Sequence, residues 1–313
     1  MGNPDKSTDC SVLITGGSGL VGKNLTSLLL SQGYRVSHLS RKSNHFGRVR
    51  VHRWDPYKRI VDPEVFNGID YIVHLAGANI GERRWTGKRK KEIALSRTDT
   101  ARFIFDVLTG YKIKLKAFIS ASGIGYYGSE TTERILTEND PHADDFLGRM
   151  CREWEEAADL FGNSGIRTVK IRTAVVLGKE SSALEKLMIP ARFGFLARIG
   201  SGRQYMPWIH VSDLARIYLK AIEDENMQGP YNAAAPQHMD HNGFMKSLAD
   251  TLRCKVILPP VPGFIIRTFL GEMSNVILNG SRISSDKITK AGFHFEFSKL
   301  DFALENILGS SHS

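Results

Sequence analysis

The sequence predicts an α/β fold of the Rossmann type: a doubly wound parallel sheet with a smaller C-terminal substrate lobe. Short apolar segments alternate with amphipathic ones from Val12 to about Arg172, and a glycine-rich turn separates the first strand from the first helix. Such alternation favours a parallel sheet with helices on both faces, because right-handed crossovers place them there. After about Leu177 glycine, proline and aromatic residues are interleaved, which indicates a change of architecture.

The expected elements follow one another at regular distances. The first strand covers 12–14, and apolar residues at helical spacing predict a helix that Gly33 ends. Further strands are expected at 35–40, 49–54, 70–77, 117–120 and 167–172, further helices at 93–108 and 149–161, and helical patterns in the second part at 213–223, 242–252 and 264–270. We therefore expect a Rossmann domain at 8–178 and a substrate lobe at 179–313, with a segment near 229–235 returning to the main sheet.

Composition argues against several classes of protein. Of the 313 residues, 42% are hydrophobic and 24% charged, as in ordinary globular proteins, and no apolar run approaches the ~20 residues that would span a bilayer. The polar segment 1–9 lacks the features of a secretory signal, and the three cysteines fit neither a disulfide framework nor a zinc site. The ten histidines show no metal-ligand spacing. We expect a cytoplasmic protein with no metal and no membrane partner.

The formal net charge is +9, and the densest basic run lies at 83–91. Such a run is typical of a solvated helix start, and attraction of a phosphate-rich cofactor or substrate explains the charge without nucleic acid. The expected partner is therefore a small molecule, with anionic and sugar-like compounds as candidates. A homodimer is a further option that the sequence leaves open.

A glycine-rich turn follows the first strand. Its spacing satisfies both G-x-G-x-x-G and G-x-x-G-x-x-G, using Gly16, Gly17, Gly19 and Gly22. Glycines at these points permit the tight turn, the close approach of backbone to a pyrophosphate and the packing of helix on strand. The helix that follows, from Leu20 and Val21 onward, offers unpaired N–H groups and its positive dipole end to phosphate. This context predicts a dinucleotide site.

The end of the second strand indicates which dinucleotide would bind. NAD sites usually place an Asp or Glu there for the ribose 2′-hydroxyl, whereas an Arg accommodates a 2′-phosphate. This strand ends with Ser40, Arg41 and Lys42, and no carboxylate occurs from Cys10 to Trp54. Arg41 and Ser40 could donate charge-assisted hydrogen bonds to a phosphate, so the sequence predicts NADP(H). The alternative is that Arg41 and Lys42 are simply solvated.

These residues, with others along the chain, resemble a known family. The matching segments are 14–17, 74–79, 95–97, 120–128, 154–155, 172–178, 200–204 and 207–215. They are similar to an atypical branch of the extended short-chain dehydrogenase/reductases, whose members are called nucleoside-diphosphate-sugar epimerase-like proteins and in part carry a SulA-type cell-division-inhibitor label. The resemblance covers nearly the whole chain and implies an NADP-linked fold with a C-terminal substrate lobe.

The resemblance also implies roles for residues outside the glycine turn. Leu75, Ala76 and Gly77 would line the adenosine-ribose side of the cofactor, where small residues let the backbone come close. Arg97 would donate to the cofactor, with Glu92 one and a half turns earlier as its partner. For both of these charged residues, a purely solvated position on a helix surface is the alternative.

The catalytic pattern of the superfamily is incomplete in this chain. A Tyr acts there as general acid/base and a Lys four residues later lowers its pKa, because a phenol with a pKa of about 10 is a weak catalyst at neutral pH. The segment 145–155, where the pair belongs, contains neither residue type, and the usual hydroxyl position falls on Gly123 with Ser122 beside it. Three possibilities stay open: Tyr126 or Tyr127 substitutes, a substrate group does this work, or the protein binds cofactor without turnover. Packing is the alternative role for both tyrosines.

The second part contains one stretch in which polar and aromatic residues are concentrated. Arg203, Trp208 and His210 could contact an anionic or sugar substrate by hydrogen bonding and stacking. For His210 and Asp213 a structural role is favoured, because Ser212 or Asp213 can cap the next helix while His210 hydrogen-bonds within the turn before it.

Two classes of function fit these observations. The first is an NADP-dependent oxidoreductase or epimerase-like enzyme that acts by hydride transfer on a hydroxyl- or carbonyl-bearing small molecule, nucleotide sugars included. The second is a non-catalytic NADP(H)-binding sensor or scaffold, for instance one linked to cell division. The missing Tyr-x-x-x-Lys pair favours the second class, and the extent of the resemblance favours the first.

Overall fold

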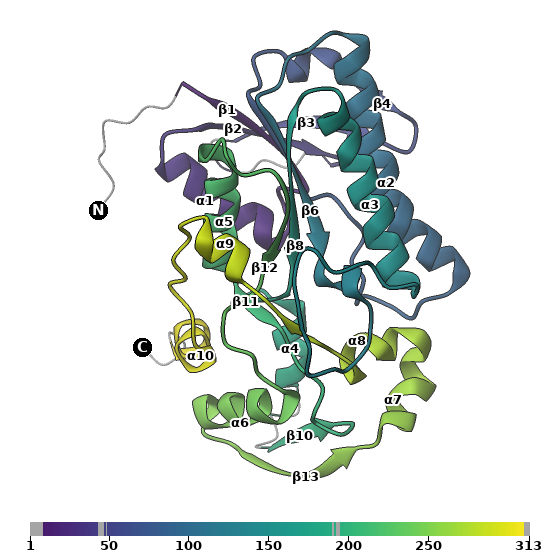
Figure 1. Cartoon of the computed structure of the whole chain (residues 1–313), viewed down its shortest axis with the longest axis vertical. Coiled ribbons are helices and arrows are strands. Elements are labelled where there is room, and N and C mark those ends of the chain that lie inside the picture. The colour runs from purple at the N-terminus through teal and green to yellow at the C-terminus, as the bar shows by residue number, and fades with distance from the viewer. Residues whose placement is uncertain (1–8, 43–46, 48, 190, 192–194, 310–313) are drawn as a thin grey trace.

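A mostly parallel sheet forms the centre of the molecule (Figure 1). The computed structural model describes residues 9–42, 47, 49–189, 191 and 195–309, so the expected domain ends at 8 and 313 lie outside the described residues. Among these residues eight strands form the sheet in the order β12-β8-β6-β5-β1-β2-β3-β4, with only β3 and β4 antiparallel. The strands are β1 (Ser11–Thr15), β2 (Arg35–Ser40), β3 (Arg50–Asp55), β4 (Ile60–Val61), β5 (Tyr71–His74), β6 (Ala117–Gly123), β8 (Arg167–Thr173) and β12 (Gly229–Ala233).

Helices cover both faces of this sheet, as the doubly wound fold requires (Figure 1). α1 (Leu20–Ser31) packs against α5 (Val211–Glu223) on one face, and α2 (Gly87–Gly110) packs against α3 (Phe146–Asn163) on the other. Short 3-10 turns, η1 (Pro63–Phe66) and η2 (Ile124–Tyr127), follow β4 and β6. The predicted Rossmann-type architecture is therefore confirmed.

Two helices begin earlier than the sequence pattern predicts. α2 begins at Gly87 instead of residue 93, because the Thr86 side chain accepts the N–H of Arg89 at 3.2 Å and caps the helix within the basic run. α3 begins at Phe146 instead of residue 149, because Asp145 accepts the N–H of Gly148 at 2.8 Å. In both cases polar capping extends the helix beyond its apolar stripe.

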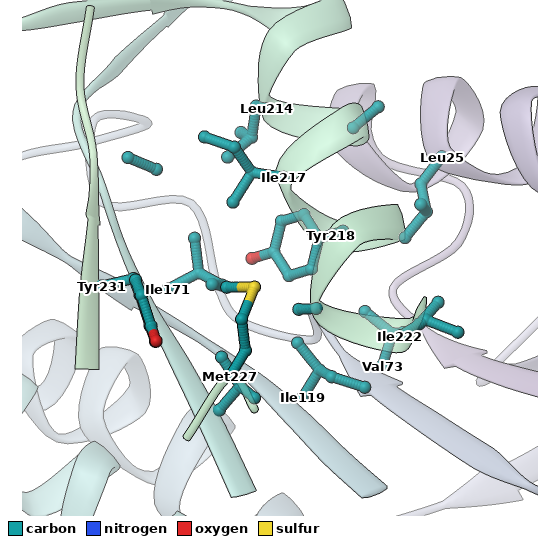
Figure 2. Close-up of a cluster of buried hydrophobic side chains, with 14 of the residues drawn as sticks. Leu25, Val73, Ile119, Ile171, Leu214, Ile217, Tyr218, Ile222, Met227 and Tyr231 are labelled. Atoms are coloured by element: carbon teal, nitrogen blue, oxygen red, sulfur yellow. The ribbon is translucent and has the colours of Figure 1, made fainter. Parts of the chain in front are cut away.

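The core divides into two layers because strand side chains alternate between the faces of the sheet. Ile14, Val73 and Ile119 point to the α1 and α5 side. Their neighbours in the three central strands point to the α2 and α3 side: Leu13, Ile72 and Phe118. Figure 2 shows the first layer, where Ile217 and Tyr218 of α5 pack over Val73, Ile119 and Ile171.

Most of the rest of the chain lies at the lower end of the molecule in Figure 1, while α9 (Asp286–Lys290) lies beside α5. Its elements are β7 (Ile135–Leu136), β9 (Val175–Leu177), α4 (Ser182–Met188), β10 (Phe195–Ile199), β11 (Trp208–His210), α6 (His241–Leu252), β13 (Lys255–Val261), α7 (Gly263–Leu270), η4 (Gly271–Ser274), α8 (Asn275–Leu278), β14 (Arg282–Ile283), α9 (Asp286–Lys290) and α10 (Leu300–Leu308). Separate parallel pairs join β9 with β11, β10 with β13 and β7 with β14. The segment 229–233 lies in the main sheet as β12, beside β8, so the chain returns to the sheet after α5.

A buried carboxylate ties this region to the sheet domain. Asp213 on α5 is fully buried and accepts the N–H groups of Glu296 and Phe297 at 3.0 and 2.9 Å. His210 caps the same helix, because its Nδ1 accepts the N–H of Ser212 at 3.2 Å. Both contacts are structural, in line with the role that the sequence favours for these two residues.

Replacing Phe118 should destabilise the second layer strongly. Its ring stacks on that of Phe161 with centroids 3.7 Å apart, and both side chains are fully buried. We expect Phe118→Ala to lower the free energy of unfolding by about 3–5 kcal/mol in urea denaturation, because the cavity cannot close. Phe302→Ala, at an exposed position of α10, should change it by less than about 0.5 kcal/mol. Equal losses would contradict this layer assignment.

Candidate cofactor site and its catalytic edge

The glycine turn after β1 touches the loop after β5. Gly16 has φ +72°, and a Cβ there would lie 2.9 Å from the backbone carbonyl carbon and oxygen of Leu75. The N–H of Gly19 donates to the carbonyl of Gly16 at 3.1 Å, which closes the turn. A Cβ on Gly22 would lie 2.5 Å from that same carbonyl oxygen. A side chain at either Gly16 or Gly22 would therefore fill space that the backbone occupies.

The first turn of α1 leaves donors available at this junction. Gly19 is the N-cap, no side chain caps the helix, and the first turn has no acidic residue. The N–H groups of Leu20, Val21 and Gly22 have no acceptor within the helix, and they lie at its positive end. Because β1 and β5 are neighbours whose chains continue to opposite sides of the sheet, this is the topological switch point where open α/β sheets bind ligands.

A buried polar network fixes the loop after β5. The Thr15 hydroxyl accepts the N–H of Ala76 at 3.1 Å and donates to Nδ1 of His74 at 2.8 Å. His74 therefore carries its proton on Nε2, which donates to the carbonyl of Arg97 at 3.3 Å. Burial lowers the pKa of His74 to about 4, so the ring is neutral at pH 7. The network holds Leu75, Ala76 and Gly77 against the glycine turn.

The buried Arg97 side chain hydrogen-bonds to the same loop. Its Nη1 donates to the carbonyl of Ile93 at 2.9 Å and its Nη2 to that of Ala78 at 3.0 Å. A Cβ on Gly77 would lie 2.8 Å from the Arg97 guanidinium carbon, so a side chain there would displace the guanidinium. Burial lowers the pKa of Arg97 to about 10, and the side chain keeps its charge at pH 7.

The predicted pairing of Glu92 with Arg97 is wrong. Glu92 pairs with Arg89 at 2.9 Å and with Arg83 at 3.5 Å. Residues five apart are rotated by about 140° around a helix, too far for their side chains to pair, whereas the three-residue spacing to Arg89 lets that pair meet. The hydrogen bond from Arg89 chiefly lowers the pKa of Glu92, and Arg41 contributes to this shift from across the site.

The end of β2 presents cations at the same edge of the sheet. Arg41 and Lys42 are exposed, and the Ser40 hydroxyl accepts the N–H of Lys42 at 3.2 Å. The Arg41 guanidinium lies 5.9 Å from the centre of the Tyr57 ring. Arg53 of β3 stands opposite Ser40 in the strand register and is exposed as well. The sequence pattern does not identify Arg53 as a site residue, because only the pairing of β2 with β3 brings it to this edge.

At the start of α3, two apolar side chains face the end of β6. A Cβ on Gly125 would lie 3.2 Å from Cβ of Leu147, and a Cβ on Gly123 would lie 3.7 Å from Sγ of Cys151. Leu147 and Cys151 are four residues apart, which is the spacing of the missing Tyr and Lys. Burial raises the pKa of the Cys151 thiol to about 12. Neither side chain can relay a proton at neutral pH.

Ser122 and Tyr127 belong to a buried network that joins β6, α3, β8 and β12. Ser122 donates to Glu155 at 2.8 Å, and Arg172 forms a bidentate pair with the same carboxylate at 2.7 and 2.9 Å. The Tyr127 hydroxyl accepts from Arg172 at 2.9 Å and donates to Oδ1 of Asn232 at 2.7 Å. Burial raises the pKa of Tyr127 to about 12. These hydroxyls are therefore engaged in structural hydrogen bonds.

Tyr126 differs from its neighbour. Its ring lies 3.5 Å from the guanidinium carbon of Arg172 and meets the ring of His142 edge-on at 6.0 Å. The residue is half-buried, and within the described part of the chain its hydroxyl makes no hydrogen bond. Arg149 and Arg152 do not reach it as substitutes for the missing Lys: Arg149 donates to the carbonyl of Asp144, and Arg152 pairs with Glu156.

The second part contributes less to the site than its composition suggests. Arg203 is exposed, Trp208 is fully buried, and the His210 ring packs on Phe297 with centroids 3.9 Å apart. Among the residues that the structure describes, no group of three or more His, Cys, Asp or Glu side chains is placed to hold a metal ion.

A family model matches the part of the chain that forms this site. The model of the NAD dependent epimerase/dehydratase family matches residues 12–234, which include the glycine turn, the loop after β5 and the network around Arg172. The chain belongs to this family. A second model, a domain of unknown function (DUF1731), matches residues 261–307 of the epimerase-family chain.

Two relatives of the epimerase-family chain are similar over nearly their whole length. It is 35% identical to the epimerase family protein YfhF of Bacillus subtilis over 301 residues, which are 95% of this chain and 98% of that protein. It is 33% identical to human epimerase family protein SDR39U1, with 95% and 99% covered. A crystal structure of the human protein with NADPH has a TM-score of 0.85 at 31% identity and covers 95% of this chain and 98% of that one. A nucleoside-diphosphate sugar epimerase from Corynebacterium glutamicum has a TM-score of 0.77 at 29% identity, with 96% and 58% covered.

The buried histidines make stability depend on pH. Burial lowers the pKa values of His38, His74 and His241 from 6.5 to about 4, so between these values the unfolded chain binds protons that the folded chain does not. The free energy of unfolding should be retained above pH 6.5 and fall as the pH drops towards 4, by up to about 1.4 kcal/mol per pH unit for each histidine.

Urea denaturation at several pH values checks this dependence. His38→Gln should reduce the slope, because the amide can still bond to Thr26 but does not titrate. Phe302→Ala, which changes an exposed side chain that does not titrate, should leave the slope unchanged. An unchanged slope in the His38 variant would show that its imidazole titrates normally in the folded protein.

Proposed function

We propose that the chain is an NADP(H)-dependent oxidoreductase or epimerase-like enzyme that acts on a hydroxyl- or carbonyl-bearing small molecule. The observation that carries this proposal is the contact between the glycine turn and Leu75, which leaves bare backbone and free helix N–H groups at the switch point of the sheet. The NADPH in the crystal structure of human SDR39U1 supports the same choice of cofactor.

The residues at this junction fit the chemistry of NADP(H). The N–H groups of Leu20, Val21 and Gly22 would hold the pyrophosphate, because a helix start without an acidic residue favours anions. Arg41, with Ser40 and Lys42, would neutralise the 2′-phosphate. Leu75, Ala76 and Gly77 would line the adenosine ribose. When bound, the reduced cofactor supplies a hydride.

Tyr126 is the group that this chain offers for proton transfer. Ser122 and Tyr127 are held in the Glu155–Arg172 network, and Leu147 and Cys151 carry no usable proton. The stacked Arg172 cation would orient the Tyr126 ring. Substrates that supply their own acidic group would not need Tyr126.

A non-catalytic NADP(H) sensor or scaffold, for instance in cell division, is the second candidate. The observation that favours it is the apolar pair Leu147 and Cys151 at the Tyr-x-x-x-Lys spacing, since it leaves the catalytic edge without the usual proton donor. A sensor would bind NADPH and NADP⁺ with different affinities yet leave both unchanged in the presence of any carbonyl or alcohol.

The C-terminal part of the chain would complete the site. A substrate lobe formed after residue 178 would lie above the edge of the sheet where the cofactor binds, and its ligand would be a small anionic or sugar-like molecule. Homodimerisation is a further option. A cytoplasmic location is supported by the three cysteines, which are all unpaired.

Removing the Arg41 charge should weaken NADPH binding selectively. Isothermal titration of Arg41→Ala is expected to show a Kd for NADPH raised about tenfold or more and an unchanged Kd for NADH, because only NADPH has the extra phosphate. Arg35→Ala, at the other end of the same strand, is the matched control and should bind both as the wild type does. Equal affinity of the wild type for NADPH and NADH would overturn the proposed specificity.

Tyr126→Phe should separate chemistry from binding. We expect NADPH oxidation by a panel of aldehydes, ketones and nucleotide sugars to fall by ~10²-fold or more, with an unchanged Kd for NADPH. Tyr127→Phe should chiefly lower the melting temperature, since it removes a buried donor to Asn232. Unchanged turnover in the Tyr126 variant would eliminate this residue as the acid. If the wild type binds NADPH but none of the substrates causes its oxidation, the sensor would be favoured.

A further inference from the structure

Helix α7 exposes two large apolar side chains. None of its residues, Gly263–Leu270, is buried. Phe264 is 69% exposed and Phe269 75%, the highest values among the large apolar side chains recorded as exposed in the described part of the chain. At 100° per residue, Phe264, Ile265 and Phe269 fall within one arc of about 140°, while Leu270 faces the protein. The two exposed phenylalanines therefore stand at the edges of one helix face, which also carries Ile265 and the exposed Thr268 and which we call the ridge.

This helix is anchored beside the basic run of the cofactor domain. Leu270 and Met273 pack in the cluster that contains Trp85, and Lys90 forms an ion pair with Glu272. The Arg84 guanidinium lies within 2.9 Å of the position that a Cβ on Gly271 would take. The ridge and the run at 83–91 thus belong to one side of the molecule, although they are far apart in the sequence.

The charge of this surface is strongly positive. Arg84, Lys88, Lys91 and Arg267 are exposed, and within the described residues none of them forms an ion pair. From Lys255 to Ser285 the sequence contains a single acidic residue, Glu272, and Lys90 already neutralises it. This side of the molecule therefore carries unpaired cations, and the ridge itself contains no acidic side chain.

We propose that α7 and the adjoining basic run bind the surface of an anionic phospholipid membrane. The phenylalanines would enter the interface between headgroups and acyl chains, and the four cations would contact lipid phosphates. Figure 1 shows α7 at the periphery of the molecule, on the side away from the centre of the sheet, where a planar surface can approach it. A ridge that protrudes can insert into a bilayer, whereas a protein partner would need a matching groove. The positive charge favours anionic lipids.

This surface differs from the sequence expectation of no membrane partner, which was based on the absence of a spanning segment. The structure likewise contains, within its described helices, none that is both long and apolar enough to cross a bilayer. Binding in the plane of the interface needs no such helix, since it depends on a short apolar face and flanking cations. The inference does not depend on the proposed enzymatic function.

Vesicle sedimentation tests the proposal with the full-length protein. We expect the protein to sediment with mixed phosphatidylcholine–phosphatidylglycerol vesicles and to stay in the supernatant with phosphatidylcholine alone. The double variant Phe264→Ser/Phe269→Ser should lose binding. Phe302→Ser, which changes a phenylalanine of 60% exposure on α10, should bind as the wild type does. Arg267→Glu should weaken binding ~5-fold or more, whereas Lys58→Glu, in the turn between β3 and β4 far from α7 in Figure 1, should not.

Three outcomes would overturn the proposal. The first is no sedimentation with anionic vesicles. The second is sedimentation that the double phenylalanine variant retains, which would indicate net charge alone. The third combines two results: the protein does not bind lipid, and its molar mass by light scattering is halved in the double variant. This combination would show that a second copy of the chain covers the ridge. Far-ultraviolet circular dichroism and an unchanged melting temperature establish that each variant is folded.

Discussion

The close backbone approach between Gly16 and Leu75 is the constraint on which the rest of the arrangement depends. Two neighbouring parallel strands end there, and any side chain at Gly16 would collide with the loop after β5. Because the backbones touch, the N-terminus of α1 points its free N–H groups into the junction. Thr15 and the neutral His74 then hold the loop in place from within the sheet.

The same constraint explains why a charged residue is buried under the loop. Arg97 spans from the carbonyl of Ile93 to that of Ala78, and it fits because Gly77 has no side chain. Its hydrogen bonds to carbonyl oxygens compensate in part for desolvation, which otherwise disfavours a buried cation. The loop is thereby held on both sides, by Thr15 above the sheet edge and by the guanidinium beneath it.

At the catalytic edge, residues that could have carried chemistry have become structural. The Arg172–Glu155 pair is buried, and removing either partner would leave an uncompensated charge, which typically costs about 3–5 kcal/mol. Ser122 donates to Glu155, the Tyr127 hydroxyl accepts from Arg172, and Asn232 accepts in turn from Tyr127. The family relationship is therefore compatible with altered chemistry, because the scaffold is conserved in this structure while the proton donors are engaged elsewhere.

The sequence by itself determined the alternation of the main strands and helices of the sheet domain, the glycine turn and the cations at the end of β2, because periodicity and strand ends are local properties. It also indicated that Tyr-x-x-x-Lys is missing. It did not reveal the partners of Ser122 and Tyr127, since Glu155, Arg172 and Asn232 come from three separate elements. Likewise, Glu92 pairs with Arg89 because helix geometry sets which side chains face each other. Only the tertiary structure decided which polar groups are free to react, because burial and hydrogen-bond partners arise from strands and helices that are distant along the chain.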